Sequence, residues 1–291
     1  MSDAQGIHWF PGHMAKTRRK ITESLSLVDA VAEIVDSRIP VSSRNPELAG
    51  IIAGKPHIIL LNKCDMADIN LTKKWIDYYR SIGKISIAVD CKSGKGVSAF
   101  SLAVKNVLAE KLEFYRAKGM VGKPLRIMVV GIPNVGKSSF INRMSHGSKA
   151  KVEDRPGVTR GNQWYTIDKE LELLDTPGVL WPKFEDAIVG EHLAFTGAVK
   201  DDVIDIETLA VRLCGYLANN YGNLLSERYK IQDLSKEPND LLCEIGKNRG
   251  MMIRGGTVDM ERASIMLLDE FRSGKLGYIT IESPEIKEKK D

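Results

Sequence analysis

Gly131, Gly136, Lys137 and Ser138 have the G-x-x-x-x-G-K-S spacing of a loop that binds phosphate groups. Glycines let successive backbone N–H groups curve around a phosphate, and a helix that starts near Lys137 directs its positive end at the same place. In loops of this kind the lysine reaches the β- and γ-phosphates, and the hydroxyl group ligates Mg²⁺. The four residues therefore predict a nucleotide site.

The segment Asn62-Lys63-Cys64-Asp65 indicates which base is bound. A carboxylate can accept hydrogen bonds from the guanine N1–H and 2-amino groups, whereas adenine offers neither donor at that edge. Such a mismatch can discriminate by about 10⁴-fold. We expect Asp65 to bind guanine, Asn62 to tie this loop to the phosphate loop, and Lys63 to lie along the base.

A third loop, Asp90-Cys91-Lys92-Ser93-Gly94, is similar to the small-residue loop that covers guanine O6 with a backbone N–H group. Alanine is usual where Cys91 stands, and serine where Asp90 stands. The match therefore indicates a base-covering loop through Cys91 and Lys92 and leaves their side-chain roles open.

Two further segments could respond to the γ-phosphate. In Asp175-Thr176-Pro177-Gly178, Asp175 would hold Mg²⁺ through water, and the Gly178 N–H would contact the γ-phosphate. Thr159 is expected to be a second Mg²⁺ ligand from a mobile loop; the less favoured alternative is a threonine of a surface turn. The expected nucleotide contacts are Asn62, Lys63, Asp65, Cys91, Lys92, Asn134, Val135, Gly136, Lys137, Ser138, Ser139, Thr159, Asp175 and Gly178.

Short apolar runs lead into these loops, and amphipathic segments lie between the runs. The expected strands are 31–35, 57–61, 85–89, 126–130 and 171–174, and the expected helices are 72–82, 97–116 and 137–144. This alternation predicts an α/β fold, a parallel sheet with helices on both faces. Ligands of such sheets bind at the carboxyl ends of the strands.

The β pattern stops near residue 183, and helical patterns take over at 187–199, 206–221, 239–248 and 260–273, followed by a short extended piece at 278–281. We therefore expect a nucleotide-binding domain over 1–182, a smaller α-helical domain over 183–284 and a disordered tail over 285–291. Length agrees with two domains, since 291 residues is about twice a common domain size.

Bulk composition excludes several classes of protein. No apolar run approaches the roughly 20 residues that span a bilayer, and no targeting segment is evident, so we expect a cytoplasmic protein. Four cysteines without a C-x-x-C pair argue against zinc and disulfides and for reduced thiols. The net charge of +4 is too small to indicate nucleic-acid binding by itself.

The order of the motifs is unusual, because the guanine loop precedes the phosphate loop. This order resembles that of the circularly permuted P-loop GTPases. The segments His8–Met14 (HWFPGHM), Asp36–Pro46 (DSRIPVSSRNP), Asp175–Asp186 (DTPGVLWPKFED) and Gly255–Gly277 narrow the resemblance to the bacterial ribosome biogenesis GTPase A family, over nearly the whole chain. It implies a Mg²⁺-dependent GTPase that acts late in assembly on the precursor of the large ribosomal subunit and contacts rRNA and ribosomal proteins. We expect a monomer.

Hydrolysis needs a group that orients the attacking water, and many GTPases use a glutamine directly after D-x-x-G. Val179 stands there in this chain and can do no proton chemistry. The resemblance implies that His13 serves instead, although by itself the sequence favours a surface histidine; His8 is expected to be structural. The expected catalytic residues are His13, Lys137, Thr159 and Gly178.

Asn134, inside the phosphate loop, could help to hold K⁺ beside the phosphates or could simply cap the loop. Basic residues occur at 16–20 and are scattered through the helical region; they could contact rRNA, as the resemblance implies, or form a solvated face. Two rival functions are a GTP-dependent RNA-processing or RNA-modification accessory factor and a scaffold that binds GTP without hydrolysis. Intact Lys137, Ser138, Thr159 and Asp175 argue against the scaffold.

Overall fold

The computed structural model describes residues 11–120, 122–145, 163–178, 186–199, 201 and 205–284, and of residues 11–17 it describes the backbone alone. The chain divides into two compact units, residues 1–185 together with 282–291, and residues 186–281. The helical unit therefore ends at residue 281, whereas the sequence placed residues up to 284 in the helical domain. The expected tail, 285–291, lies outside the described residues.

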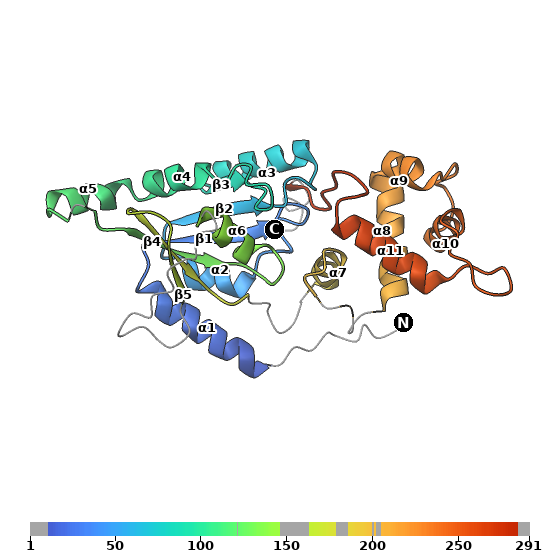
Figure 1. The fold of residues 1–291 in the computed structure, drawn as a ribbon, viewed down its shortest axis with the longest axis horizontal. Coiled ribbons are helices and arrows are strands. Elements are labelled where there is room, and N and C mark those ends of the chain that lie inside the picture. The colour runs from blue at the N-terminus through green and yellow to red at the C-terminus, as the bar shows by residue number, and fades with distance from the viewer. Residues whose placement is uncertain are drawn as a thin grey trace. The chain divides into compact units, whose positions relative to one another are not determined.

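A single sheet organises the first unit (Figure 1). Its described strands are β1 (Ala30–Asp36), β2 (His57–Asn62), β3 (Ile85–Ala88), β4 (Leu125–Val130), β5 (Gln163–Thr166) and β6 (Leu171–Asp175), in the order β3-β2-β1-β4-β6-β5. Neighbours pair in parallel except β5, which runs antiparallel to β6 at one edge. The predicted parallel α/β sheet is confirmed, and β5 is an addition that the sequence did not predict.

Helices cover both faces of this sheet. They are α1 (Pro11–Leu25), α2 (Pro46–Ile52), α3 (Ile69–Ser81), α4 (Ala99–Val107), α5 (Ala109–Ala117) and α6 (Lys137–Met144). The helix expected over 97–116 is thus divided at Leu108, which has non-helical backbone angles. Helices α1 and α2 were not predicted; α2 is short and begins at Pro46, with the Asn45 side chain accepting the amides of Glu47 and Leu48.

Burial of alternate strand residues against these helices forms the core of the first unit. One cluster joins Ile21 of α1 and Ile52 of α2 to Val31, Met128 and further strand residues. A second joins Trp75 and Tyr79 of α3 to Val35, Ile59 and Leu61. Every residue of β1 is buried, as expected for a central strand of a parallel sheet. The core fixes the strands, and thereby the loops that follow their carboxyl ends.

The regular elements described in the second unit are helices: α7 (Ala187–Phe195), α8 (Ile206–Asn220), α9 (Gly222–Tyr229), α10 (Pro238–Asn248) and α11 (Met260–Arg272). Helix α8 contacts each of the other four and buries Leu209, Leu213 and Leu217. Residues 278–281 form no paired strand. In the described parts of the chain, no helix has both the length and the apolar character that a membrane span requires.

Candidate nucleotide-binding site

Loops from three parallel strands line one cavity of about 760 Å³ at the carboxyl ends of β2, β3 and β4. Its lining residues are Asn62, Lys63, Asp65, Met66, Asp90, Cys91, Lys92, Asn134, Gly136, Ser139, Asn142 and Arg143. The expected base loop and the expected phosphate loop therefore meet, despite their reversed order in the sequence. The strands explain why: β2 and β4 are the two neighbours of β1.

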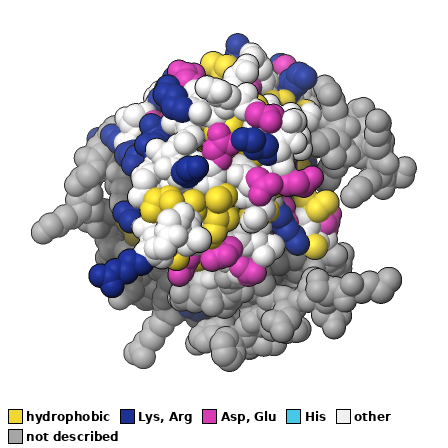
Figure 2. All heavy atoms as spheres, turned by 90° about the vertical axis from the view of Figure 1, so that its right-hand side faces the viewer, with side chains coloured by type: hydrophobic (Ala, Val, Ile, Leu, Met, Phe, Trp, Pro, Cys, Tyr) yellow, Lys and Arg dark blue, Asp and Glu magenta, His cyan; other side chains and the backbone are white. Residues whose placement is uncertain are grey.

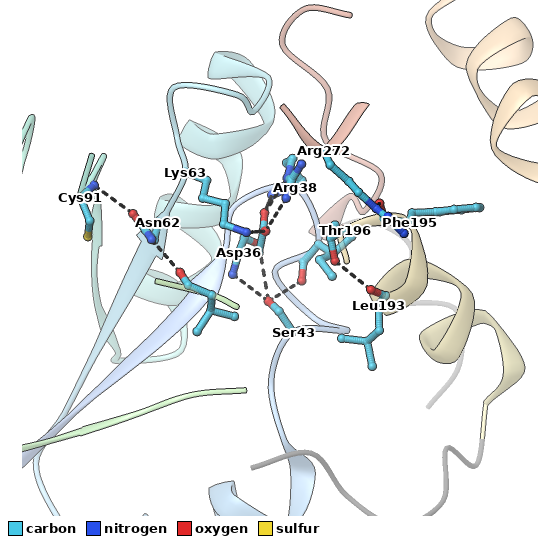
Figure 3. A network of polar contacts seen from close by, with 12 residues as sticks. Asp36, Arg38, Ser43, Asn62, Lys63, Cys91, Leu193, Phe195, Thr196 and Arg272 are labelled. Atoms are coloured by element: carbon cyan, nitrogen blue, oxygen red, sulfur yellow. Dashed lines mark hydrogen bonds and ion pairs between the residues drawn. The ribbon is translucent and has the colours of Figure 1, made fainter. Parts of the chain in front are cut away.

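The side chain of Asn62 joins all three loops (Figure 3). Its Nδ2 donates to the carbonyl oxygen of Val135, 2.6 Å away, and its Oδ1 accepts from the backbone N–H of Cys91 at 3.1 Å. Asn62 is 3% exposed, so these bonds are shielded from water and hold the loops firmly. The predicted tie between Asn62 and the phosphate loop is present.

Gly136 is required for this close approach. A Cβ atom built on Gly136 would lie 2.3 Å from the Asn62 Nδ2, and the residue has a φ of +101°. Both the space and the backbone conformation exclude other side chains. The second glycine of the phosphate loop therefore serves the contact with Asn62 in addition to the turn that starts α6.

Helix α6 begins at Lys137, directly after Gly136, so its unpaired N–H groups face the loop. Ser138 and Ser139 are exposed in its first turn. Lys137 is buried, and its Nζ donates to the carbonyl oxygens of Gly131 (3.1 Å) and Ile132 (2.9 Å). Burial lowers the pKa of Lys137 to about 8, although the nearby Asp175 carboxylate acts to raise it. The loop thus holds a buried cation that anionic phosphates would stabilise.

The segment 175–178 lies against the phosphate loop. A Cβ atom on Gly178 would lie 2.8 Å from the Lys137 Nζ and 2.9 Å from the Pro133 nitrogen, and the Thr176 hydroxyl donates to the Val129 carbonyl oxygen at 2.7 Å. Asp175 Oδ1 is buried with no hydrogen-bond partner. Burial raises the pKa of Asp175, which Lys137 opposes. A buried carboxylate oxygen without a hydrogen-bond partner is well suited to ligate a metal cation.

Two carboxylates, those of Asp65 and Asp90, lie among the residues that line the base end of the cavity. Burial and the charge of Asp90 raise the pKa of Asp65. Hydrogen-bond donors from a ligand would therefore stabilise the ionised form of its carboxylate. Asp90 Oδ1 already accepts the amides of Lys92 (2.8 Å) and Ser93 (3.1 Å). Since the Cys91 amide donates to Asn62, the N–H groups expected to cover guanine O6 are engaged within the protein.

Arg143 and Asn142, in the last turns of α6, line the cavity but were not among the predicted residues. The Arg143 guanidinium donates to the carbonyl oxygens of Cys91 (3.4 Å from Nε) and Lys92. It therefore fixes the third loop to the phosphate-loop helix. The only sequence signal for this role is the position of a basic residue two turns after Lys137 on the same helix.

Not every predicted residue can be placed. Thr159 lies outside the described residues, and the backbone of His13 belongs to α1 while its side chain is not described. Asn134 lines the cavity with a φ of +61° and is exposed. Val135 contributes its carbonyl oxygen to Asn62 rather than a cavity-lining side chain. The cysteines are free thiols; burial raises the pKa of Cys91 to about 12.

Comparison with known proteins agrees with this site. A family model described as "50S ribosome-binding GTPase" matches residues 126–244. The chain is 47% identical to ribosome biogenesis GTPase A of Bacillus cereus, over 96% of this chain and 94% of the relative. It is 48% identical to the protein of the same name from Priestia megaterium, over 96% of this chain and 97% of the relative.

Solved structures show the same similarity. A GDP-bound structure of TM YlqF, 28% identical, superimposes with a TM-score of 0.68 over 92% of this chain and 100% of that chain. A GNP-bound structure of YlqF from T. maritima, 27% identical, gives 0.62 over 93% and 99%. Near-half identity over almost the full length, together with these folds, shows that the chain belongs to the ribosome biogenesis GTPase A family and is an enzyme that hydrolyses GTP.

Proposed function

We propose that this GTPase acts late in the assembly of the large ribosomal subunit: it binds the precursor of that subunit, hydrolyses GTP there and then leaves. The observation that carries the GTP site is the convergence of the 62–65 and 131–138 loops on one cavity, clasped by Asn62. The names of the relatives and of the matching family supply the ribosomal part of the proposal.

In this proposal Asp65 accepts the two guanine donors, and Lys63 lies along the base. Lys137 binds the β- and γ-phosphates, the first-turn amides of α6 bind the remaining phosphate oxygens, and the Gly178 N–H contacts the γ-phosphate. The burial of Lys137 and the nearness of Gly178 to its ammonium group support these roles.

Members of such families use Mg²⁺ with the nucleotide, and the residues here suit that ion. Asp175 offers a buried, unpaired carboxylate oxygen, and Ser138 offers an exposed hydroxyl in the first turn of α6. Together with Thr159, these residues would hold Mg²⁺, which would neutralise charge on the phosphates. Hard oxygen ligands are those that Mg²⁺ prefers.

Nucleotide binding should be accompanied by proton uptake at Lys137. Its pKa of about 8 in the free protein means that roughly half of the molecules lack the proton at pH 8. Phosphate charge favours the ammonium form, so GDP binding should take up about half a proton at pH 8. Titration calorimetry in buffers of different ionisation enthalpy measures this uptake. Binding heats that do not depend on the buffer at pH 8 would contradict it.

Hydrolysis at this site requires a group other than Val179 to orient water, and we propose His13. Purified large subunits should raise the GTPase rate, and His13→Ala should remove most of that increase while GDP affinity stays within about twofold. Small subunits serve as the control. Absence of stimulation would contradict the ribosomal assignment, and full stimulation of His13→Ala would exclude a catalytic role for His13.

We further propose that Asn134 helps to hold K⁺ beside the phosphates, where the cation supplies positive charge to the transition state. Support comes from its place on the cavity wall and its left-handed backbone. Turnover in KCl should exceed turnover in NaCl at equal ionic strength by about tenfold or more, and Asn134→Ala should abolish the difference. Equal rates in the two salts would leave Asn134 a loop-capping residue.

The helical unit is the proposed contact with rRNA and ribosomal proteins. Basic and acidic side chains are interspersed around a group of hydrophobic ones on the face of the molecule seen in Figure 2. Lys247, Arg249 and Arg254 are exposed in and after α10. Phosphate contacts by such residues would make subunit binding strongly salt-dependent. A ribosomal partner is consistent with the expected cytoplasmic location, and the monomeric state stays a prediction.

A further inference from the structure

The turn between β1 and α2 has an unusual interior. Asp36, Ser37 and Arg38 are polar, yet they are 2%, 1% and 1% exposed. Burying an ion pair costs free energy unless its geometry is good and its remaining hydrogen bonds are satisfied. A group of buried charges directly beside the cavity therefore calls for an explanation.

The Asp36 carboxylate holds Arg38 and Lys63 at the same time (Figure 3). Its Oδ1 accepts from the backbone N–H of Arg38 at 3.0 Å and from the Arg38 Nε at 2.9 Å. Its Oδ2 accepts from the Arg38 Nη2 at 2.8 Å and from the Lys63 Nζ at 2.9 Å. The end of β1 pairs with the end of β2, which places Asp36 beside Asn62 and its successor Lys63.

Lys63 itself is in a costly conformation. Its φ is +61°, in the left-handed region that residues other than glycine rarely adopt. It lines the cavity. The ion pair with the buried Asp36 fixes the far end of the side chain, and therefore the path of its aliphatic stem beside the space expected for the base.

The opposite side of the same turn is held by Glu282, the residue at which the chain rejoins the first unit. Its carboxylate accepts hydrogen bonds from two backbone amides: that of Val41, 2.5 Å from Oε2, and that of Ser42, 3.0 Å from Oε1 and 3.2 Å from Oε2. Its Oε1 also accepts a hydrogen bond from the Ser42 hydroxyl. Its carbonyl oxygen accepts from the Trp75 Nε1 at 2.9 Å. Glu282 is 8% exposed.

Ser43 connects the two sides of the turn. Its hydroxyl oxygen accepts the Asp36 amide at 3.0 Å, and the hydroxyl donates to the Ile39 carbonyl oxygen at 2.7 Å. A continuous set of hydrogen bonds and short backbone steps thus runs from Glu282 through residues 41–43 to Asp36, and from there to Lys63.

We propose that Asp36 and Arg38 are positioning residues for Lys63 in guanine recognition, and that Glu282 keeps their turn closed. The affinity for guanine nucleotides then depends on whether the segment that leaves the helical unit is docked on residues 41–42. This inference rests on the proposed assignment of the base to the 62–65 loop. Release of Glu282 would leave two amides without partners and loosen the turn that carries Asp36.

The test uses the full chain with Glu282→Gln, Lys63→Met and the double variant. In Glu282→Gln an amide NH₂ replaces one carboxylate oxygen and faces N–H donors, whereas Lys63→Met keeps the stem and removes the ammonium group. Each should weaken GDP binding by about fivefold or more, and the double variant should be no weaker than Lys63→Met. Glu237→Gln, an exposed carboxylate without a side-chain capping bond, is the matched control.

Competition by inorganic pyrophosphate, which has no base, separates positioning from general loss of structure. Its affinity should be unchanged in Glu282→Gln. An equal fall for pyrophosphate and GDP, a GDP affinity unchanged in either single variant, or losses that multiply in the double variant would each overturn the inference. If Glu282→Gln does not fold, Ser42→Ala, which removes a single donor to Glu282, replaces it under the same criteria.

An Asp65→Asn variant keeps the two hypotheses apart. If this variant does not bind xanthosine diphosphate more tightly than GDP, the base site itself is misassigned and the positioning inference is wrong as well. If its preference does change in this way while Lys63→Met and Glu282→Gln bind GDP normally, the proposed function survives and only the positioning inference is wrong.

Discussion

Asp65→Asn should lower the affinity for GTP by roughly 10³-fold and raise the affinity for xanthosine triphosphate above it. A carboxylate accepts the N1–H and 2-amino protons of guanine, whereas an amide side chain offers one donor and one acceptor. Xanthine carries a carbonyl oxygen in place of the 2-amino group, so it matches the amide. Competition of both nucleotides against a fluorescent guanine nucleotide measures the exchange.

Asp77→Asn is the control, because Asp77 is exposed in α3 and pairs with the exposed Arg80. It should leave both affinities unchanged. A loss of GTP binding without a gain for the xanthine nucleotide would mean that Asp65 supports the loop rather than reads the base. Unchanged GTP affinity would remove Asp65 from the site.

Asp36→Asn should lower the free energy of unfolding by about 3–5 kcal/mol, since it leaves the Arg38 guanidinium buried without its countercharge. Arg38 is 1% exposed and cannot turn to solvent without opening the turn. Urea unfolding followed by circular dichroism measures the loss. The same substitution at Asp77, in an exposed pair, should cost less than about 1 kcal/mol, and equal losses at the two sites would contradict the buried-charge account.

The pH dependence of stability gives an independent check on Asp36. Burial acts to raise its pKa, but the charges of Arg38 and Lys63 prevail and hold the pKa far below its ordinary value. A depressed pKa contributes stability that is complete above the unfolded-state value near pH 4 and is lost as the pH falls below it. The wild type should therefore lose more stability than Asp36→Asn between about pH 4 and pH 2.5.

The sequence predicted the sheet well because each buried strand is a short apolar run that ends at a polar residue or a glycine. The strands expected at 57–61, 126–130 and 171–174 lie within β2, β4 and β6. Strand β5 (Gln163–Thr166) was not predicted because it is short and partly polar, and only its residue Trp164 is buried. Edge strands need no continuous apolar pattern.

The phosphate and base loops were predictable because their chemistry depends on residue spacing along one segment. Local spacing says nothing about partners far along the chain, so the bonds of Asp36 to Lys63 and of Glu282 to Ser42 could not be foreseen. The segment containing Asp36 contributed to the family resemblance but gave no hint of its role. For His13 and Thr159 the catalytic roles stay predictions.

Glu282 has a consequence for synthesis of the chain. It bonds to Val41 and Ser42 across 241 and 240 positions, so these two amides are translated long before their partner. Contacts of such long range close late in folding. On the proposed role of Glu282, a nascent polypeptide whose residue 282 is still inside the exit tunnel has an open turn beside Lys63 and should bind guanine nucleotides weakly.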